Sequence, residues 1–344
     1  MKLHEIYVHG YHPRENERLQ DQAGTLVDLL HSDTTYPAGS TVLEIGCGVG
    51  AQTVPLAQRS PAARFTSIDL SANSIEEASR KVAQAGLKNV EFLEADIFAM
   101  PFKAESFDHI FVCFVLEHLA LPAQALVILR RLLRPGGTIT VIEGDHGSTY
   151  FYPDSSAAHE AIRCLVRVQQ QTGGNALIGR QIYPLLVKAG FAAVRVSPRT
   201  VYVDSSRPDL VDAFIRKTFT AMIEGIREPA VSARLIDSKS FDAGIRDLYR
   251  TMEADGVFCY TFFKGVGEKR SRNSPSQQRR RQRQTLQPPV KGEESFIADR
   301  PPSCASVSLG GKRRTGLPRK SVNRKQYALD FLLLDSLGES GLFS

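Results

Sequence analysis

The chain has 344 residues, of which 42% are hydrophobic and 23% are charged, as in an ordinary soluble globular protein. No run reaches the roughly 18 consecutive apolar residues that a membrane-spanning helix needs. The amino terminus lacks the hydrophobic region of a signal peptide, so we expect a cytoplasmic protein with no membrane partner. The five cysteines lie far apart and in no metal-ligand spacing, so no metal site is expected.

The net charge of +6 is unevenly distributed along the chain. From Gly267 onward there are 16 Lys and Arg against 7 Asp and Glu, whereas the first 266 residues carry 27 against 30. The body is therefore mildly acidic, which argues against nucleic-acid binding by the folded part. The region 267–344 is rich in Ser, Gln, Pro and Arg, which predicts a disordered basic tail. Three interpretations of this tail stay open: a solvated segment, a nuclear-entry signal or polyanion-binding arm, and a misread gene end.

Residues 1–40 are predicted to form an arm and a helix that cover one side of a ligand site. The stretch from Tyr7 to Pro13 is rich in aromatic and turn residues, and the stretch from Arg14 to Leu30 has helical periodicity. We expect Tyr7 or Tyr11 to lie over a bound cofactor. Packing of both tyrosines onto the domain is the alternative.

Residues 41–145 alternate between predicted strands and predicted helices. The strands are expected at 42–45, 64–69, 90–96, 109–114 and 138–142, and the helices at 51–60, 75–85 and 123–133, with a turn at 134–137. The strand at 109–114 has no polar face, as is usual for a central parallel strand. This alternation predicts a doubly wound parallel α/β sheet with right-handed crossovers.

Beyond residue 145 the pattern changes. We expect a loop at 145–153, helices at 156–172, 178–189, 208–226 and 241–254, and strands at 191–203 and 256–264. The two strands extend the sheet. The insertions at 145–176 and 205–254 are rich in Phe, Tyr, Ile and Leu, and they are predicted to cap an apolar pocket for an acceptor. Completion of the core or a homodimer contact is the alternative role.

The stretch from Val42 to Gly50 carries the strongest functional signal. An apolar strand with Glu44 near its end runs into three glycines at alternate positions, where a ligand can approach the backbone closely. Asp69 and Asp96 end the next two predicted strands, and the carboxyl ends of neighbouring parallel strands form a nucleoside-binding crevice. A dinucleotide fold uses a similar glycine turn, so the glycines alone do not identify the cofactor.

The three carboxylates favour S-adenosylmethionine over a dinucleotide. Glu44 stands where a pyrophosphate would gain nothing from a negative charge. Asp69 can accept both hydroxyls of a ribose, and Asp96 can accept the amine of adenine with Ile97 beside the ring. S-adenosylmethionine has a positive sulfonium and no phosphate, so acidic residues suit it.

A short-chain reductase would need a Tyr-x-x-x-Lys motif on a helix. Tyr260 and Lys264 have this spacing, but they lie in an apolar aromatic segment that predicts a strand. A spacing of four on a strand does not bring the two side chains together as a helix does. We therefore discount a reductase.

These motifs together resemble the class I S-adenosylmethionine-dependent methyltransferases. The resemblance spans about residues 40–145 and rests on 42–50, Asp69, 94–97, 107–108, 115–119 and 133–137. The flanks at 10–11, 18–22 and 143–148 resemble a subgroup common in fungal secondary-metabolite clusters, which includes N-methyltransferases of dioxopiperazine-type products. The tail has no counterpart in the family pattern.

The resemblance implies a Rossmann-like, seven-stranded sheet in the order 3-2-1-4-5-7-6, with strand 7 antiparallel and helical cap insertions. It implies methyl transfer to N or O of a small molecule, with a cofactor pocket lined by Tyr11, Glu44, Gly46, Cys47, Gly48, Gly50, Asp69, Leu70, Asp96, Ile97 and Phe114. A pathway or assembly protein that keeps the fold but transfers no methyl is the alternative.

A sulfonium methyl is already electrophilic, so the protein mainly aligns a nucleophile with it. A general base helps only where the nucleophile arrives protonated. Candidates after the fourth and fifth predicted strands are Glu117, His118, Asp145 and His146. We favour His146, in a loop predicted to be flexible, and then His118, for which a helix-start or backbone-facing role is the alternative.

Overall fold

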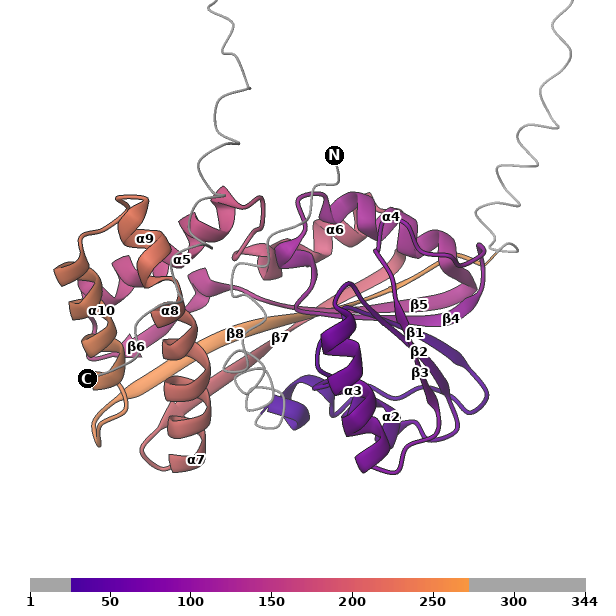
Figure 1. Ribbon diagram of the computed structural model, residues 1–344, viewed down its shortest axis with the longest axis horizontal. Helices are drawn as coiled ribbons and strands as arrows, with labels where there is room; N and C mark the ends of the chain where they lie inside the picture. The colour runs from indigo at the N-terminus through magenta and orange to yellow at the C-terminus, as the bar shows by residue number, and fades with distance from the viewer. Residues whose placement is uncertain (1–25, 272–344) are drawn as a thin grey trace, which may run out of the picture. The chain divides into compact units, whose positions relative to one another are not determined.

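A mixed sheet runs through the part of the chain that the structure, a computed structural model, describes, residues 26–271 (Figure 1). Its strands are β1 (Thr41–Ile45), β2 (Arg64–Asp69), β3 (Val90–Glu94), β4 (Phe107–Cys113), β5 (Leu133–Gly144), β6 (Tyr150–Tyr152), β7 (Ala192–Asp204) and β8 (Val257–Glu268). The order is β3-β2-β1-β4-β5-β8-β6, and β7 pairs with β8. Strands β1 to β5 are parallel, whereas β8 is antiparallel to its neighbours.

This arrangement confirms the predicted sheet. β8 takes the place expected for strand 7 and β7 that of strand 6. The short strand β6 is an addition, and the prediction of a loop throughout 145–153 was wrong there. Phe151 is buried between exposed Tyr150 and Tyr152, and the three residues pair with β8. Alternation of buried and exposed aromatic residues suits a short edge strand.

Helices cover both faces of the parallel half of the sheet. The helices are α2 (Thr53–Arg59), α3 (Ala72–Gln84), α4 (Pro122–Leu132), α5 (Ser156–Gln171), α6 (Ile182–Lys188), α7 (Pro208–Leu210), α8 (Ala221–Gly225), α9 (Arg227–Ser232) and α10 (Ser238–Arg250). Short 3-10 turns are η1 (Leu116–His118), η2 (His146–Ser148) and η3 (Ile178–Gln181), and η4 (Val211–Thr220) is a π-helix. Figure 1 shows α2 and α3 on one face and α4 and α6 on the other, while α5, α8, α9 and α10 gather around the far end of β8.

Local sequence explains where several helices begin. Ser71 accepts a hydrogen bond from the Ser74 N–H and caps α3, and Ser155 does the same for α5 through the Ala158 N–H. α4 begins at Pro122, whose missing N–H costs nothing in the first turn. The predicted helices at 75–85, 123–133 and 156–172 are therefore confirmed, with shifts of up to a few residues at their ends.

Two buried apolar clusters lie on opposite faces of the sheet. Val42 and Phe111 belong to the cluster that includes α5, α8, α9 and α10, called the cap helices below. Leu43 and Ile110 belong to the cluster under α4 and α6. Adjacent residues of one strand thus enter different clusters, as the period of two along a strand requires. The prediction that the fourth strand is apolar on both faces is confirmed.

The predicted ends of two strands need correction. β3 stops at Glu94 rather than Asp96, because the Asp96 carboxylate accepts the Phe98 N–H and closes a turn. β5 begins at Leu133, so the predicted turn at 134–137 is part of the strand. Gly136 there has a φ of +86° and donates its N–H to the Lys269 carbonyl, so the chain just beyond β8 supplies the partner.

The predicted helix at 208–226 is interrupted by the π-helix η4. A rotation of about 100° per residue would place Phe214 and Phe219 about 140° apart on an α-helix. In a π-helix, whose hydrogen bonds join residues i and i+5, residues five apart lie much closer to the same face. Both rings therefore contact the same strand: Phe214 lies 6.0 Å and Phe219 5.5 Å from the Tyr260 ring. Helix α9 was not predicted.

The segment before β1 is tied to the middle of β8. The predicted helix at 14–30 is described only from Leu26, and it continues to His31. Just after it, Asp33 and Thr34 accept hydrogen bonds from Lys264, which is only 4% exposed. Tyr7 and Tyr11 and the tail from residue 272 lie outside the described residues, so the predictions about them stay predictions.

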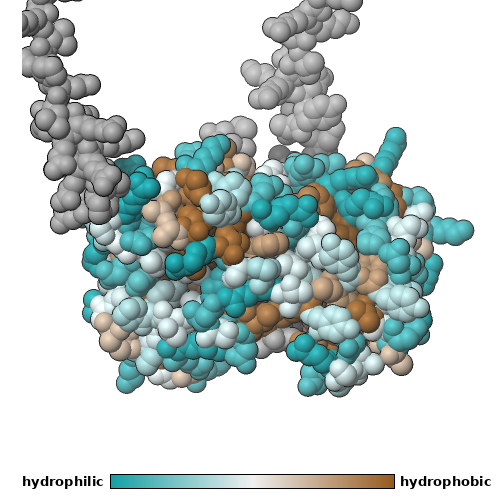
Figure 2. All heavy atoms as spheres, turned by 180° about the vertical axis from the view of Figure 1, so that it is seen from behind, coloured by the Kyte–Doolittle hydropathy of each residue, from teal (hydrophilic) through white to brown (hydrophobic). Residues whose placement is uncertain are grey.

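None of the helices in the described range is both long and apolar enough to cross a membrane. On the face turned away in Figure 1, polar side chains divide the apolar surface into separate patches (Figure 2).

Candidate cofactor and methyl-transfer site

The glycine turn after β1 is shaped for a close approach by a ligand. Gly46, Gly48 and Gly50 all have positive φ, at +65°, +49° and +78°. A Cβ on Gly46 would lie 2.5 Å from Val115 Cγ2, and one on Gly50 would lie 3.0 Å from Ala78. A Cβ on Gly48 would meet nothing within 4 Å. The turn is thus packed at its two ends and has open space above its centre.

Two of the predicted acids lie beside this turn and make different contacts. The Asp69 Oδ2 accepts the Gly48 N–H at 2.8 Å, and Oδ1 accepts the Ser71 N–H at 2.9 Å. Glu44 is 2% exposed and accepts a 2.6 Å hydrogen bond from the Ser67 hydroxyl. Burial raises the pKa of Asp69 above its ordinary value, and raises the pKa of Glu44 from 4.5 to about 7.

The other residues predicted for the cofactor differ in accessibility. Asp96 and Leu70 are exposed, and Leu70 is 52% accessible. Ile97 and Cys47 are buried, and Cys47 donates its N–H to the Ile68 carbonyl. Direct contact with a ligand is therefore open to Asp96 and Leu70, whereas the Cys47 side chain belongs to the core. Their roles in binding stay predictions.

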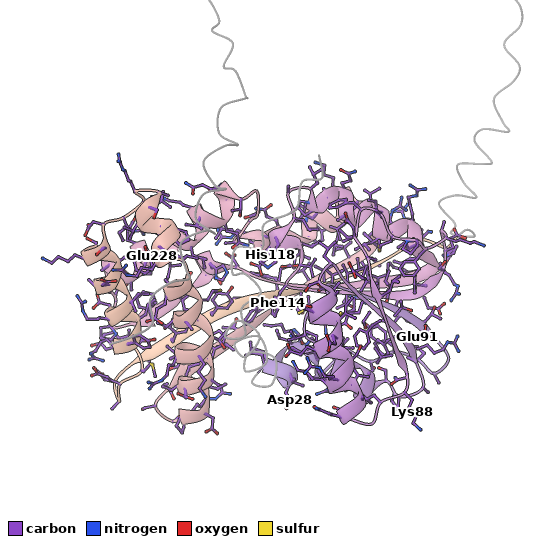
Figure 3. All side chains as sticks on the ribbon, in the orientation of Figure 1. Asp28, Lys88, Glu91, Phe114, His118 and Glu228 are labelled. Carbon is purple, nitrogen blue, oxygen red and sulfur yellow. The ribbon has the colours of Figure 1, made fainter. Side chains whose placement is uncertain are left out.

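Phe114, directly after β4, has an unusual backbone. Its φ is +58°, a left-handed conformation that costs a non-glycine residue roughly 1–2 kcal/mol. Its N–H donates to the Ile142 carbonyl, and its ring lies 5.5 Å from that of Phe262. Figure 3 shows Phe114 and His118 in the middle of the molecule, whereas Lys88 and Glu91 lie at the outer edge of the sheet. Strained residues of this kind cluster at functional sites.

One carboxylate lies between the two predicted catalytic histidines. Glu117 Oε1 is 3.7 Å from His118 Nε2, and Glu117 Oε2 is 3.9 Å from His146 Nε2. The side chains of His146 and Glu117 are 6% and 12% exposed. The structure thus brings the ends of β4 and β5 together as the sequence predicted. The catalytic role of each histidine stays a prediction.

The Glu117 segment is held by two residues that were not among the predicted site residues, Glu143 and Gln169. Glu143 Oε1 accepts the N–H groups of Val115 and Leu116 at 3.1 and 2.7 Å. Gln169 Nε2 donates to the Glu117 carbonyl at 3.0 Å and to its Oε2 at 3.2 Å. Burial and the nearby Glu117 raise the pKa of Glu143 well above its ordinary value. Glu143 and Gln169 are both fully buried.

His146 is firmly placed, so the prediction of a flexible loop was wrong. It is 5% exposed, donates its N–H to the Ala176 carbonyl, and has Nδ1 3.3 Å from the Tyr260 hydroxyl. The preceding Asp145 caps this turn and accepts two hydrogen bonds from Arg180, at 2.6 and 2.8 Å. Asp145 therefore has a structural ion pair, which makes it a poor candidate for a base.

Aromatic side chains cover this polar cluster. The residues Phe214, Phe219, Phe258, Tyr260 and Phe262, called the aromatic wall below, have ring centroids 4.7–6.2 Å from their neighbours in the set. His146 joins the wall through Phe219, at 6.1 Å. Tyr260 and Lys264 both lie on β8, as predicted, and contact different groups: Tyr260 contacts His146, and Lys264 contacts Asp33.

No group of three or more His, Cys, Asp and Glu between residues 26 and 271 is placed to hold a metal ion. The residues around the glycine turn do fit S-adenosylmethionine. The open space at Gly48 admits a ligand against the backbone, and no Lys or Arg in the described range forms a salt bridge with Glu44 or Asp69. Acids without a basic partner suit a cationic ligand better than a pyrophosphate.

Comparison with known proteins agrees with this site. A family model described as "Methyltransferase domain" matches residues 43–141. An uncharacterized 37.1 kDa protein in transposon Tn4556 of Streptomyces fradiae is 36% identical over 202 residues, 58% of this chain and 57% of the relative. Demethylmenaquinone methyltransferase of Lactococcus lactis is 31% identical over 115 residues, 33% of this chain and 46% of the relative. The chain spans about half the length of these curated relatives.

Two solved structures are similar at low identity. Phosphoethanolamine N-methyltransferase 2 of Haemonchus contortus, in complex with S-adenosyl-L-methionine, has 17% identity and a TM-score of 0.45, and the match covers 73% of this chain and 53% of that one. A putative methyltransferase from Bacillus halodurans has 17% identity and a TM-score of 0.46, with 72% and 100% covered.

The strand order and the glycine turn with Asp69 lie within and around the segment 43–141 that matches the methyltransferase-domain model. In this chain the domain match covers 43–141, and the cap helices follow it.

Proposed function

We propose that this protein transfers a methyl group from S-adenosylmethionine to a nitrogen or oxygen of a small organic acceptor. The observation that supports this most is the position of the Glu117–His146 pair after β4 and β5, on the same edge of the sheet as the glycine turn after β1. A parallel sheet brings a cofactor turn and an acceptor-binding group to one edge in this way.

The bound cofactor would supply an electrophilic methyl on a sulfonium. The chain's own residues then have two tasks. Gly48 and Asp69 would bind and orient the cofactor. The aromatic wall would keep water away from the reacting nitrogen or oxygen. His146 Nε2, which has Glu117 3.9 Å away, is the proposed base for an acceptor that arrives protonated.

The finer proposal concerns the acceptor. The aromatic wall surrounds the polar cluster with apolar side chains, and one relative is named for demethylmenaquinone. We propose a role in secondary metabolism, in line with the resemblance of residues 143–148 to enzymes of fungal metabolite clusters. A cytoplasmic location, nuclear entry through the basic tail and a homodimer stay predictions.

Calorimetry with S-adenosylmethionine and S-adenosylhomocysteine tests the cofactor, with Asp69→Ala as the variant expected to lose binding. Transfer of a radiolabelled methyl to extracts of the source organism, followed by identification of the labelled product, tests the activity. Failure of both cofactor forms to bind would refute the proposal. Tight binding without a labelled product would favour a pathway protein that transfers no methyl.

A further inference from the structure

Two buried oxygen atoms beside Glu117 have no hydrogen-bond partner. They are Glu143 Oε2 and Gln169 Oε1, and both residues have 0% of their surface exposed. A buried polar atom left unpaired costs about 1–3 kcal/mol, and native structures hold few of them. Such atoms at a proposed acceptor site indicate which groups the acceptor must carry.

The position of each unpaired atom is fixed by the rest of its side chain. Glu143 Oε1 is occupied by the N–H groups of Val115 and Leu116, so Oε2 is the free oxygen. Gln169 Nε2 donates to two oxygens of Glu117. If the amide were flipped, the Gln169 oxygen would face these two oxygens and both hydrogen bonds would be lost. The amide orientation is thereby settled, and Oε1 can only accept a hydrogen bond.

The charges around these atoms exclude an anionic partner. Throughout residues 26–271, neither Glu117 nor Glu143 forms a salt bridge with Lys or Arg, and Arg180 is engaged by Asp145. Burial and Glu117 raise the pKa of Glu143 well above its ordinary value, so this residue holds its proton until a positive charge lies beside it. A cation next to Oε2 favours the ionised carboxylate, whereas an anion would raise the pKa further.

We propose that the methyl acceptor is an amine, cationic when protonated, whose N–H groups bind Glu143 Oε2 and Gln169 Oε1. The inference rests on the proposed function and goes further by naming the substrate class. It makes Glu143 and Gln169 specificity-determining residues that select against carboxylates and phosphates.

Three matched probes test this class: 2-phenylethylamine, 2-phenylethanol and 3-phenylpropanoate share an apolar ring and differ in the polar head. Each is titrated by calorimetry into the full chain saturated with S-adenosylhomocysteine. We expect the amine to bind at least about tenfold more tightly than the carboxylate, which corresponds to about 1.4 kcal/mol. Equal binding, a preference for the carboxylate, or no binding of any probe would overturn the proposal.

The variant Glu143→Gln sharpens the test. A glutamine keeps an oxygen for the Val115 and Leu116 N–H groups, but it cannot become a carboxylate beside a cation, and its NH2 group stands where Oε2 stood. The amine should lose about tenfold in affinity, and its preference over the carboxylate should disappear or reverse. Glu91→Gln, an exposed position at the outer edge of the sheet, is the matched control and should change neither value (Figure 3).

The cofactor gives an independent readout in the same experiment. Affinity for S-adenosylhomocysteine and the melting temperature should be unchanged in Glu143→Gln if this residue meets the acceptor. A loss of cofactor affinity larger than the loss of amine affinity would show that Glu143 contacts the cofactor, and would overturn the inference. Failure of S-adenosylhomocysteine to bind the wild-type chain is a different result, because it refutes the proposed function itself.

Discussion

Glu117 Oε2 lies 3.9 Å from His146 Nε2, so the end of β4 and the turn after β5 meet in one buried pair. If this pair takes a proton from the acceptor, Glu117→Gln keeps the shape but removes the negative charge that stabilises a protonated imidazole. We expect the kcat of methyl transfer to fall by about 10²-fold, the lower range for general acid–base catalysis. The affinity for S-adenosylhomocysteine should stay as in the wild type. Steady-state kinetics with an accepted amine measure this, and an unchanged kcat would exclude the pair from proton transfer.

Gly48 and Gly50 offer a matched pair of substitutions. Both have positive φ, so alanine at either position carries a similar backbone cost of roughly 1–2 kcal/mol. Only Gly50→Ala adds a contact of 3.0 Å with the Ala78 backbone, whereas Gly48→Ala places its methyl in open space. We expect Gly50→Ala to have the lower melting temperature and Gly48→Ala the larger loss of S-adenosylhomocysteine affinity, about tenfold or more. Thermal unfolding and calorimetry on both variants decide it; the reverse pattern would place the cofactor elsewhere.

Glu44 predicts a pH dependence of stability. Its folded pKa of about 7 is above its ordinary value of 4.5, so the folded state binds the proton more tightly than the unfolded state does. This contribution to the free energy of unfolding is fully present below pH 4.5 and is lost as the pH rises to about 7. The increase of the Glu44 pKa from 4.5 to about 7 corresponds to about 3 kcal/mol in the free energy of unfolding.

Glu44→Gln cannot lose a proton, so it should equal the wild type near pH 4.5 and become increasingly more stable than it toward pH 7.5. Urea unfolding of the cofactor-free chain across this range measures the difference. Parallel stability curves for the two proteins would mean that Glu44 stays ionised in the folded state.

Asp145 and Arg180 form an ion pair in which the carboxylate is buried and the guanidinium is half exposed. Arg180→Met leaves a buried carboxylate without its partner, and we expect a loss of stability of about 2–3 kcal/mol, below the range for a completely buried pair because of that exposure. Adding Asp145→Asn should recover part of the loss. Arg250→Met breaks the exposed pair with Asp255 and should change stability little. Chemical denaturation of the wild type, the two arginine variants and the double variant measures these stabilities. Equal effects of Arg180→Met and Arg250→Met would contradict the prediction.

Most of the fold followed from the sequence because its signals were local. Alternating apolar strands, Ser71 as a helix cap and Pro122 at a helix start each act over a few residues. The π-helix η4 did not follow, because it depends on how Phe214 and Phe219 pack against β8. Strand β6 was missed for a similar reason: three residues form a strand only because β8 is beside them.

Some residues of the candidate site could likewise be predicted from the sequence, and others could not. The glycine turn and Asp69 were recognisable because their spacing is fixed by adjacent strand ends. Gln169 was not, since it comes from the middle of α5 and reaches Glu117 only in the folded chain. Glu143 carried a signal that was available: an acid inside an otherwise apolar strand end needs a buried partner.

Strand β8 links two distant parts of the molecule through one fixed spacing. Tyr260 contacts His146 at the proposed methyl-transfer site, and Lys264 binds Asp33 in the segment before β1. Four residues of strand span about 13 Å, and every second side chain points to the same face. Inserting or deleting one residue between them would turn one of the two side chains to the other face of the sheet. Across related chains, the length of 260–264 is therefore expected to vary less than the identity of the residues at 261–263.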